Sequence, residues 1–198
     1  ATVTVLDSIP PTITCPADIT QGNDAGLCSA VVSFAPTFGD NCPGATVVCV
    51  PASGSVFPVG TTAINCTVTD ASGNTATCSF NVTVNDTEDP TINCPSDITQ
   101  ANDAGLCSAV VNFTVTATDN CPGVSFTCTP ASGSVFPVGT TTVNCIATDG
   151  SGNTATCSFT VTVNDTEDPV AVCQNGPPPP PSTAQQTRFH LGSIWLGP

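Results

Sequence analysis

The chain has 198 residues, with fifteen acidic side chains against one basic side chain, which gives a net charge of −14 at pH 7. This balance excludes nucleic acid as a partner, because affinity for phosphates depends on Lys and Arg. No stretch has the length and apolar character of a membrane-spanning helix, and no signal peptide is visible. The sequence therefore predicts no membrane insertion and indicates a mature secreted product or a segment of one.

A period of 79 residues governs the chain up to about residue 173. The segment NDAGLCSAVV at 23–32 returns unchanged at 102–111, and PASGSVFPVGTT at 51–62 returns at 130–141. Such a period dictates the architecture before any local propensity does. In chain order we expect the last strand of a preceding repeat plus a linker at 1–8, a first repeat at 9–84, an acidic linker at 85–89, a second repeat at 90–163, an acidic linker at 164–168, the first strand of an incomplete third repeat at 169–175, and a Pro-rich spacer with a divergent tail at 176–198.

Within each repeat, apolar and polar residues alternate with the period of half-buried strands. In the first repeat the alternation runs through 28–34, 64–68 and 78–84. Turn sequences rich in Gly, Pro and Asn separate these runs, such as DNCPG at 40–44 and DASGN at 70–74. About seven short strands in each repeat predict an all-β fold, namely tandem immunoglobulin-like antiparallel β-sandwiches stapled by disulfides.

The cysteines follow the same period, with six in each repeat and a thirteenth at Cys173. Small domains with many cysteines and no Cys-x-x-Cys pair are typical of disulfides rather than zinc. We expect three bridges in each repeat, among Cys15, Cys28, Cys42, Cys49, Cys66 and Cys78 and among Cys94, Cys107, Cys121, Cys128, Cys145 and Cys157. A hairpin at DASGN places Cys66 opposite Cys78, but a bridge from Cys28 to Cys66 competes, so the pairing stays open. Cys173 is a candidate for an intermolecular disulfide.

The turn and strand motifs occur in one order in both repeats: DNCPG, then P-x-SGS-x-FPVGTT, a cysteine, and TD-x-SGN-x-A-x-C-x-F-x-VTV. An Asp-rich linker before P-T-I-x-C-P closes the series, which covers residues 9–163 as two copies. This order resembles the hyalin repeat, an immunoglobulin-like module of extracellular proteins. The resemblance implies a module of cell adhesion and extracellular matrix that has no catalytic activity.

Both ends of the chain are predicted to hold strands without a sheet. The segment at the start aligns with the last strand of each repeat, and a segment near the end aligns with the first strand: Ala1, Thr2, Val3, Thr4 and Val5, and Val170, Ala171 and Val172. Unpaired strands offer backbone donors and acceptors to another chain, so we expect self-association into a head-to-tail polymer or pairing with neighbouring repeats. A fragment with frayed ends is the alternative. The tail after five consecutive prolines is either a docking peptide or an artefact of the gene model.

Carboxylates gather at the predicted joint between the repeats. In an immunoglobulin-like module, two loops of the second repeat lie at the pole beside the incoming linker. Calcium takes six to eight oxygen ligands, so the acids of loops and linker are a candidate calcium site: Asp86, Glu88, Asp89, Asp119 and Asp149. The pattern resembles cadherin linkers, although acids that only keep the linker solvated would give the same sequence. The first joint, which is the linker LDSIP at 6–10 before the first repeat, keeps only Asp7 of the acids, so we expect weaker binding there.

Five Asn residues stand in N-glycosylation triplets, although such triplets arise readily by chance in a Thr-rich chain: Asn65, Asn81, Asn85, Asn112 and Asn164. A glycan coat would suit the threonine-lined strand faces.

Residues 1–187 contain no Lys, Arg or His, which excludes Ser-His-Asp and Cys-His chemistry within the repeats. We therefore predict a non-catalytic structural or adhesion protein, secreted or on the cell surface. Its repeats would form a rod or filament subunit that assembles head to tail, by strand donation from its termini. The alternative is a ligand-recognition module of a large adhesin, which binds a glycan or a protein through loops such as DNCPG. Near-identical loops in both repeats favour the scaffold.

Overall fold

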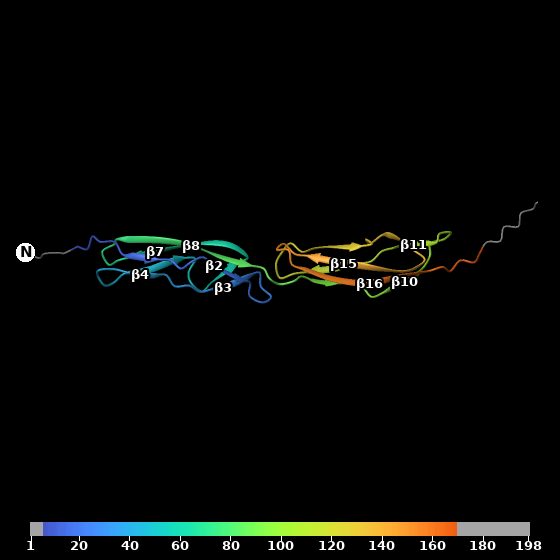
Figure 1. Ribbon diagram of the computed structural model, residues 1–198, viewed down its shortest axis with the longest axis horizontal. Coiled ribbons are helices and arrows are strands. Elements are labelled where there is room, and N and C mark those ends of the chain that lie inside the picture. The colour runs from blue at the N-terminus through green and yellow to red at the C-terminus, as the bar shows by residue number, and fades with distance from the viewer. Residues whose placement is uncertain (1–5, 170–198) are drawn as a thin grey trace, which may run out of the picture. The chain divides into compact units, whose positions relative to one another are not determined.

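The computed structural model describes residues 6–169, and this part of the chain consists of strands, turns and loops (Figure 1). The strands of the first repeat are β1 (Thr12–Thr14), β2 (Ile19–Gly22), β3 (Ser29–Val32), β4 (Thr37–Gly39), β5 (Thr46–Val50), β6 (Ser55–Pro58), β7 (Gly60–Thr69) and β8 (Thr75–Asn85). Those of the second repeat are β9 (Thr91–Asn93), β10 (Ile98–Ala101), β11 (Ser108–Val111), β12 (Thr116–Thr118), β13 (Ser125–Thr129), β14 (Ser134–Pro137), β15 (Gly139–Thr148) and β16 (Thr154–Asn164). Within residues 6–169, no helix has the length and hydropathy needed to cross a membrane.

Three predictions concern residues outside the described range: the terminal strands at 1–5 and 170–172, the intermolecular disulfide of Cys173, and the tail at 176–198.

Each repeat is a two-layered β-sandwich. In the first repeat, one layer is a four-stranded sheet in the order β2-β8-β7-β5, and the other consists of the pairs β1-β4 and β3-β6. The second repeat has the same order with β10-β16-β15-β13, β9-β12 and β11-β14. Figure 1 shows β7 and β8 side by side in the first repeat, and β15 and β16 likewise in the second. The predicted fold class, a tandem immunoglobulin-like β-sandwich, is confirmed.

The first strand of each repeat is divided between the two layers. β1 pairs with β4 in one layer, whereas β2 joins β8 in the other as a parallel ladder, an exception to the antiparallel pairing expected. Pro16 lies between β1 and β2. Because proline has no N–H to donate to a strand ladder, it favours the point at which the chain passes from one layer to the other. Asp18 then accepts the backbone N–H of Asn81 at 2.7 Å just before β2 begins, and Asp97 accepts that of Thr160 at 2.7 Å.

The core lies between the layers and follows the predicted alternation. In β3, Ala30 and Val32 are buried, and Val31 between them is 52% exposed. Their partners are Phe57 from β6 and alternate residues of β7 and β8. Phe34 packs edge-on against Phe80, with ring centroids 4.9 Å apart. The second repeat places the matching residues in its own core.

The hairpin β7-β8 is the longest ladder of the first repeat, and it sets Cys66 opposite Cys78, as the sequence predicts. These two cysteines nevertheless bond to other partners. Cys66 bonds to Cys49, its neighbour across the β5-β7 ladder, and Cys78 bonds to Cys15 in the opposite layer. The second repeat has the equivalent bridges Cys128–Cys145 and Cys94–Cys157. Each repeat therefore has two internal disulfides. One joins adjacent strands of one sheet, and the other joins the two layers.

Candidate functional site at the joint between the repeats

The linker that follows β8 is held against the first repeat by its own side chains. The backbone N–H and the hydroxyl of Thr87 both donate to Asn23 Oδ1, at 3.0 and 3.2 Å. One residue later, a carboxylate oxygen of Glu88 accepts the backbone N–H of Gly26 at 2.7 Å. Asn23 also closes its own loop, since its amide donates to the carbonyl of Leu27 at 2.8 Å. The loop 23–28 and the linker thus form one hydrogen-bonded unit.

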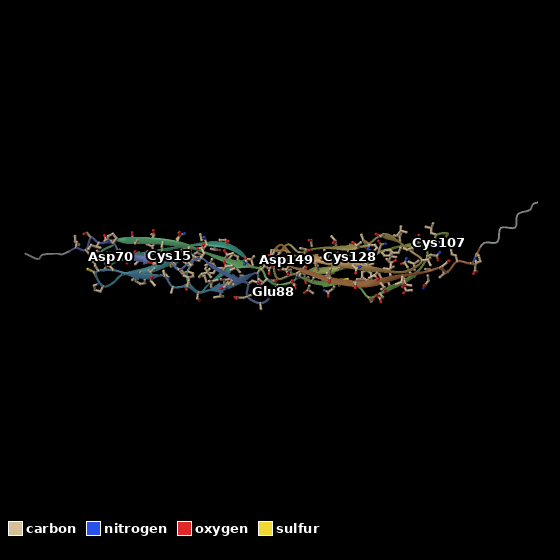
Figure 2. The ribbon with its side chains drawn as sticks, viewed as in Figure 1. Cys15, Asp70, Glu88, Cys107, Cys128 and Asp149 are labelled. Carbon is tan, nitrogen blue, oxygen red and sulfur yellow. A yellow bond between two sulfur atoms is a disulfide. The ribbon has the colours of Figure 1, made fainter. Side chains whose placement is uncertain are left out.

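The other side of the linker is tied to the β15-β16 turn of the second repeat. The amide of Asn153 donates to the carbonyl of Asp86 at 3.3 Å and to a carboxylate oxygen of Asp149 at 2.8 Å. The other Asp149 oxygen accepts the backbone N–H groups of Ser151, Gly152 and Asn153. Gly152 has a φ of 95°, which suits glycine in this turn. Figure 2 labels Asp149 near Glu88 at this end of the second repeat.

The pKa of Asp149 is lowered by the turn in which this carboxylate lies. Burial by itself raises the pKa of this carboxyl, but the hydrogen bonds from Asn153, Ser151 and Gly152 lower it, and the net pKa lies below its ordinary value. The same balance lowers the pKa of Asp70 in the first repeat. The carboxylate is thus the form that the turn stabilises.

A disulfide crosses the joint. Cys28 of the first repeat bonds to Cys121 of the second, with their Cα atoms 4.8 Å apart. Beside it, the amide of Asn120 donates to the carbonyl of Leu27 at 3.1 Å. The expectation of three bridges within each repeat therefore needs correction, since Cys42 and Cys107 are unpaired within the described residues. The physical reason is proximity: the loops that carry Cys28 and Cys121 meet at the joint, whereas Cys28 and Cys42 belong to opposite ends of one sandwich.

Two carboxylates with one buried oxygen each lie next to this disulfide. Oxygens of Asp86 and Asp119 and the sulfur of Cys121 lie within 4.8 Å of one another. Asp86 is only 6% exposed, and Asp86 Oδ2 and Asp119 Oδ1 are buried oxygens without a hydrogen-bond partner. Two carboxylates this close together repel each other when both are charged. A cation between them would remove this repulsion, so the oxygens present fit calcium as part of its ligand set.

The remaining predicted calcium ligands are placed differently. Glu88 is bound to Gly26, Asp149 is engaged in its own turn, and Asp89 is exposed. The sulfur of Cys121 is in a disulfide and is not a ligand. The structure therefore brings Asp86 and Asp119 together and directs the other three acids elsewhere.

The first joint contains an acid cluster that the sequence analysis missed. Oxygens of Asp7, Asp40 and Asp70 lie within 4.8 Å of one another, and Asp40 Oδ1 is buried without a partner. A shift of Asp119 and Asp149 by the 79-residue period would have identified Asp40 and Asp70. The backbone N–H of Ile9 lowers the pKa of Asp7, helped by Cys42 and Asn41, and the hydrogen bond with Asp7 raises the pKa of the Cys42 thiol.

The predicted glycosylation residues all lie at the surface. The side chains of Asn65, Asn81, Asn85, Asn112 and Asn164 are exposed, although the amide of Asn81 also contacts Asp18 at 3.3 Å.

Comparison with known proteins gives relatives with this module. The model of the HYR domain matches residues 6–84 and 85–163. A protein named hyalin from Strongylocentrotus purpuratus is 40% identical over 170 residues, which is 82% of this chain and 14% of that protein. A protein named hyalin from Lytechinus variegatus is 36% identical over 181 residues, which is 85% of this chain and 34% of that protein. The chain thus spans a minor part of the length of both relatives.

Solved structures similar to this chain include cadherins. The crystal structure of mouse cadherin-23 EC22-24 is 13% identical, with a TM-score of 0.41 over 78% of this chain and 66% of that one. The structure of Drosophila N-cadherin EC1-4 is 14% identical, with a TM-score of 0.38 over 79% of this chain and 50% of that one. The family itself is established by the domain matches, which cover most of the sequence, and by the two relatives named hyalin. The predicted resemblance is confirmed, and the chain belongs to the HYR domain family, of which it contains two tandem copies.

Proposed function

We propose that this chain is a non-catalytic, extracellular structural and adhesion protein, in which tandem repeats form one stretch of a rod or filament. The observation that carries the proposal is the joint, where the Cys28–Cys121 disulfide links the two repeats covalently. The five disulfides among residues 6–169 support an extracellular location, because such bonds persist in oxidising compartments. A fixed joint serves a scaffold, whereas a free hinge is the default between domains.

Three separate contacts would restrict this joint. The disulfide is one, the contact of Glu88 with Gly26 ties the linker to the first repeat, and the contact of Asn153 with Asp86 ties it to the second. Each removes rotational freedom that a short, solvated linker would otherwise keep. Their combination supports a stiff connection rather than a flexible tether.

We further propose that calcium binds at the joint. Asp86 and Asp119 would hold it with their unpartnered oxygens, and the ion would supply positive charge where two carboxylates repel. The cluster of Asp7, Asp40 and Asp70 would hold a second ion at the first joint. Backbone carbonyls and water would complete the ligand set, as they do in many calcium sites.

Joint stiffness is tested by the distribution of distances between two spin labels, one on each repeat. We expect one narrow distribution for the native chain and a broader one for Cys28→Ser/Cys121→Ser. The matched control is Cys49→Ser/Cys66→Ser, which removes a disulfide within the first repeat and leaves the joint unchanged. Equal widths for the native chain and the joint variant would contradict the proposal.

Self-association head to tail, by strand donation from residues 1–5 and 170–172, is a separate part of the proposal. Electron microscopy of the full chain should show filaments, and a chain that lacks residues 1–5 should show short particles. Filaments of unchanged length would exclude strand donation. The exposed sequon residues support a glycan coat, which intact mass before and after deglycosylation measures.

A second candidate function, recognition of a ligand, is favoured by one observation. An open groove of about 500 Å³ is bordered by Phe34, Phe38 and Val48 and by Ala52 and Ser53 of the PASGSV loop. The second repeat has a similar groove of about 480 Å³. Phe38 is 44% exposed, so it would offer an apolar contact to a glycan or peptide. Loss of binding to a glycan array in Phe38→Ala would support recognition, and no binding by the native chain would exclude glycans.

A further inference from the structure

Two cysteines in the described part of the chain have no disulfide partner, and both are exposed. They are Cys42 in the first repeat and Cys107 in the second. Their positions in the repeat are informative: Cys107 lies 79 residues after Cys28, and Cys42 lies 79 residues before Cys121. They are therefore the counterparts of the two cysteines that bond across the joint.

The surroundings of Cys107 already have the arrangement found around Cys28. The amide of Asn102 donates to the carbonyl of Leu106 at 2.8 Å, the distance at which Asn23 donates to Leu27. The backbone N–H of Gly105 donates to Glu167 at 2.8 Å, as that of Gly26 does to Glu88 at 2.7 Å. Figure 2 labels Cys107 at the end of the second repeat. The loop that carries Cys107 thus has the same hydrogen bonds as the loop that carries Cys28.

The surroundings of Cys42 match those of Cys121 in the same way. The backbone N–H of Cys42 donates to Asp40 at 3.3 Å, and that of Cys121 donates to Asp119 at 2.9 Å. The amide of Asn74 donates to the carbonyl of Asp7 at 3.1 Å, as Asn153 does to Asp86.

One contact differs between the two surroundings of Cys42 and Cys121. The amide of Asn41 reaches the carboxylate of Asp7, whereas its counterpart Asn120 reaches the carbonyl of Leu27 in the preceding repeat. Burial differs correspondingly: Cys121 is 7% exposed beside its partner repeat, and Cys42 is exposed.

We infer that Cys42 and Cys107 each form an inter-repeat disulfide of the kind seen between Cys28 and Cys121. Each bonds to a cysteine of an adjoining HYR repeat. Cys107 pairs with the counterpart of Cys42 in the following repeat, and Cys42 pairs with the counterpart of Cys107 in the preceding repeat. A disulfide then links successive repeats at every joint of an array, as Cys28–Cys121 links the two repeats of this chain. The inference rests on the proposed function, because it assumes that repeats adjoin one another in line.

Bond formation requires an oxidant of the disulfide class, such as glutathione disulfide. One thiol, as its thiolate, attacks a sulfur of glutathione disulfide and releases one glutathione thiolate. The second protein thiolate then attacks the mixed disulfide and releases the other glutathione. In sum, the two cysteine thiols lose two protons and two electrons, and one glutathione disulfide becomes two glutathione thiols.

The adjoining repeat has two sources, a second copy of this chain or a further repeat in the same polypeptide. The first experiment tests the second copy. All proteins carry Cys173→Ser, so that this residue cannot contribute, and Cys42→Ser and Cys107→Ser are prepared separately, one with an isotope label. Each is incubated in a glutathione redox buffer, alone and mixed, and then analysed by non-reducing electrophoresis and peptide mass mapping.

The mixture should give a heterodimer in which the Cys107 peptide is joined to the Cys42 peptide. Each variant alone should stay monomeric, because it holds one half of the pair. The chain with both cysteines should form a ladder of oligomers under the same conditions. Since Cys42 and Cys107 are exposed, their substitution leaves the cores intact, and circular dichroism of each variant verifies this.

The second experiment tests a repeat in the same polypeptide. Residues 85–163 are repeated once more directly after residue 163, which preserves the 79-residue period. Peptide mapping should find Cys107 bonded to the counterpart of Cys121 in the added repeat, and alkylation should no longer label Cys107. A link in either experiment supports the inference and identifies the source. Homodimers as abundant as heterodimers in the first experiment, together with a freely alkylated Cys107 in the second, overturn it.

These outcomes are independent of those that test the proposed function. Spin-label distances report the joint between Cys28 and Cys121, which is intact in every variant used here. A narrow distance distribution with no Cys42–Cys107 link would overturn only the disulfide inference. A broad distribution with the link present would instead contradict the stiff scaffold.

Discussion

The backbone N–H of Gly26 donates to the carboxylate of Glu88, 62 residues later in the chain, at 2.7 Å. Gly105 and Glu167 repeat the contact at 2.8 Å. In both DTEDP linkers, the glutamate thus accepts a hydrogen bond from the repeat that precedes the linker.

Replacement of Glu88 by Ala should loosen the linker from the loop 23–28. A hydrogen bond to a charged group contributes about 1.5–3 kcal/mol, and partial exposure reduces this to about 1 kcal/mol here. Hydrogen exchange at the Gly26 amide should therefore accelerate by about fivefold to tenfold. Asp89→Ala is the control, because Asp89 is exposed in the same linker. An unchanged exchange rate in Glu88→Ala would remove this contact from the account of the joint.

Calcium should raise the melting temperature through the joint. A ligand at a hundred times its Kd stabilises the folded state by about 2.7 kcal/mol. Asp119→Asn should abolish the part of this gain that arises at the joint between the repeats, because it removes one of the two carboxylates that hold a buried oxygen there. Differential scanning calorimetry with calcium and with a chelator measures the effect, and Asp89→Asn should behave as the native chain does. Identical melting curves with and without calcium would exclude the ion.

Acid should destabilise the β7-β8 and β15-β16 turns. The pKa values of Asp70 and Asp149 lie below their ordinary value in the folded chain, where burial is outweighed by hydrogen bonds. The stability they contribute is fully present above the unfolded pKa of about 3.9 and is lost as the pH falls through the lower folded pKa. Urea midpoints between pH 6 and pH 2 should therefore decline below about pH 4. The decline should be shallower in Asp70→Asn/Asp149→Asn, and an equal slope would refute the assignment.

The first repeat should be destabilised selectively by Phe57→Ala. Phe57 is 1% exposed in the core between β6 and the opposite sheet, and truncation of a buried Phe costs about 3–5 kcal/mol. Val56→Ala is the matched control, because its neighbour Val56 is 65% exposed. Native-state hydrogen exchange should show faster opening of β7 and β8, with β15 and β16 protected as before. Equal effects of both substitutions would contradict the observed strand orientation.

The two disulfides within a repeat should differ in their contribution to stability. Cys15 and Cys78 are 63 residues apart and Cys49 and Cys66 are 17 apart. Loop-closure entropy then gives about 4 kcal/mol for the longer loop and about 3 kcal/mol for the shorter one. Urea unfolding of Cys15→Ala/Cys78→Ala and of Cys49→Ala/Cys66→Ala measures both losses. A larger loss for the shorter loop would show that packing, not chain entropy, dominates.

The sequence predicts the fold well because its signals are local. Alternation in β3 identifies Ala30 and Val32 as core residues, and the DASGN turn fixes Cys66 opposite Cys78. The disulfide partners cannot be predicted from these local signals. From the sequence we expect each repeat to close its own disulfides, whereas Cys28 bonds to a cysteine 93 residues away. No local pattern indicates which loops of successive repeats meet.

The candidate site shows the same division. The sequence identifies the linker as acidic, but charge alone does not distinguish Asp86, whose oxygen is buried without a partner, from Glu88, which binds a backbone N–H. Backbone donors are present in every loop, and only the folded arrangement decides which acid reaches one. Asp40 and Asp70 are different, because the 79-residue period alone would have identified them, although the sequence analysis did not apply it to these acids.

The Cys15–Cys78 bridge has a consequence for a chain that is pulled by its two ends. It joins the end of β1 to β8, so tension that enters the first repeat passes through sulfur to β8 and on to the linker. The chain between the two cysteines, which are 63 residues apart, therefore bears no tension while the bridge is intact. At about 3.5 Å per residue, roughly 200 Å of chain cannot extend. A repeat with this bridge should thus resist extension under force, and reduction of the bridge should release the added contour length.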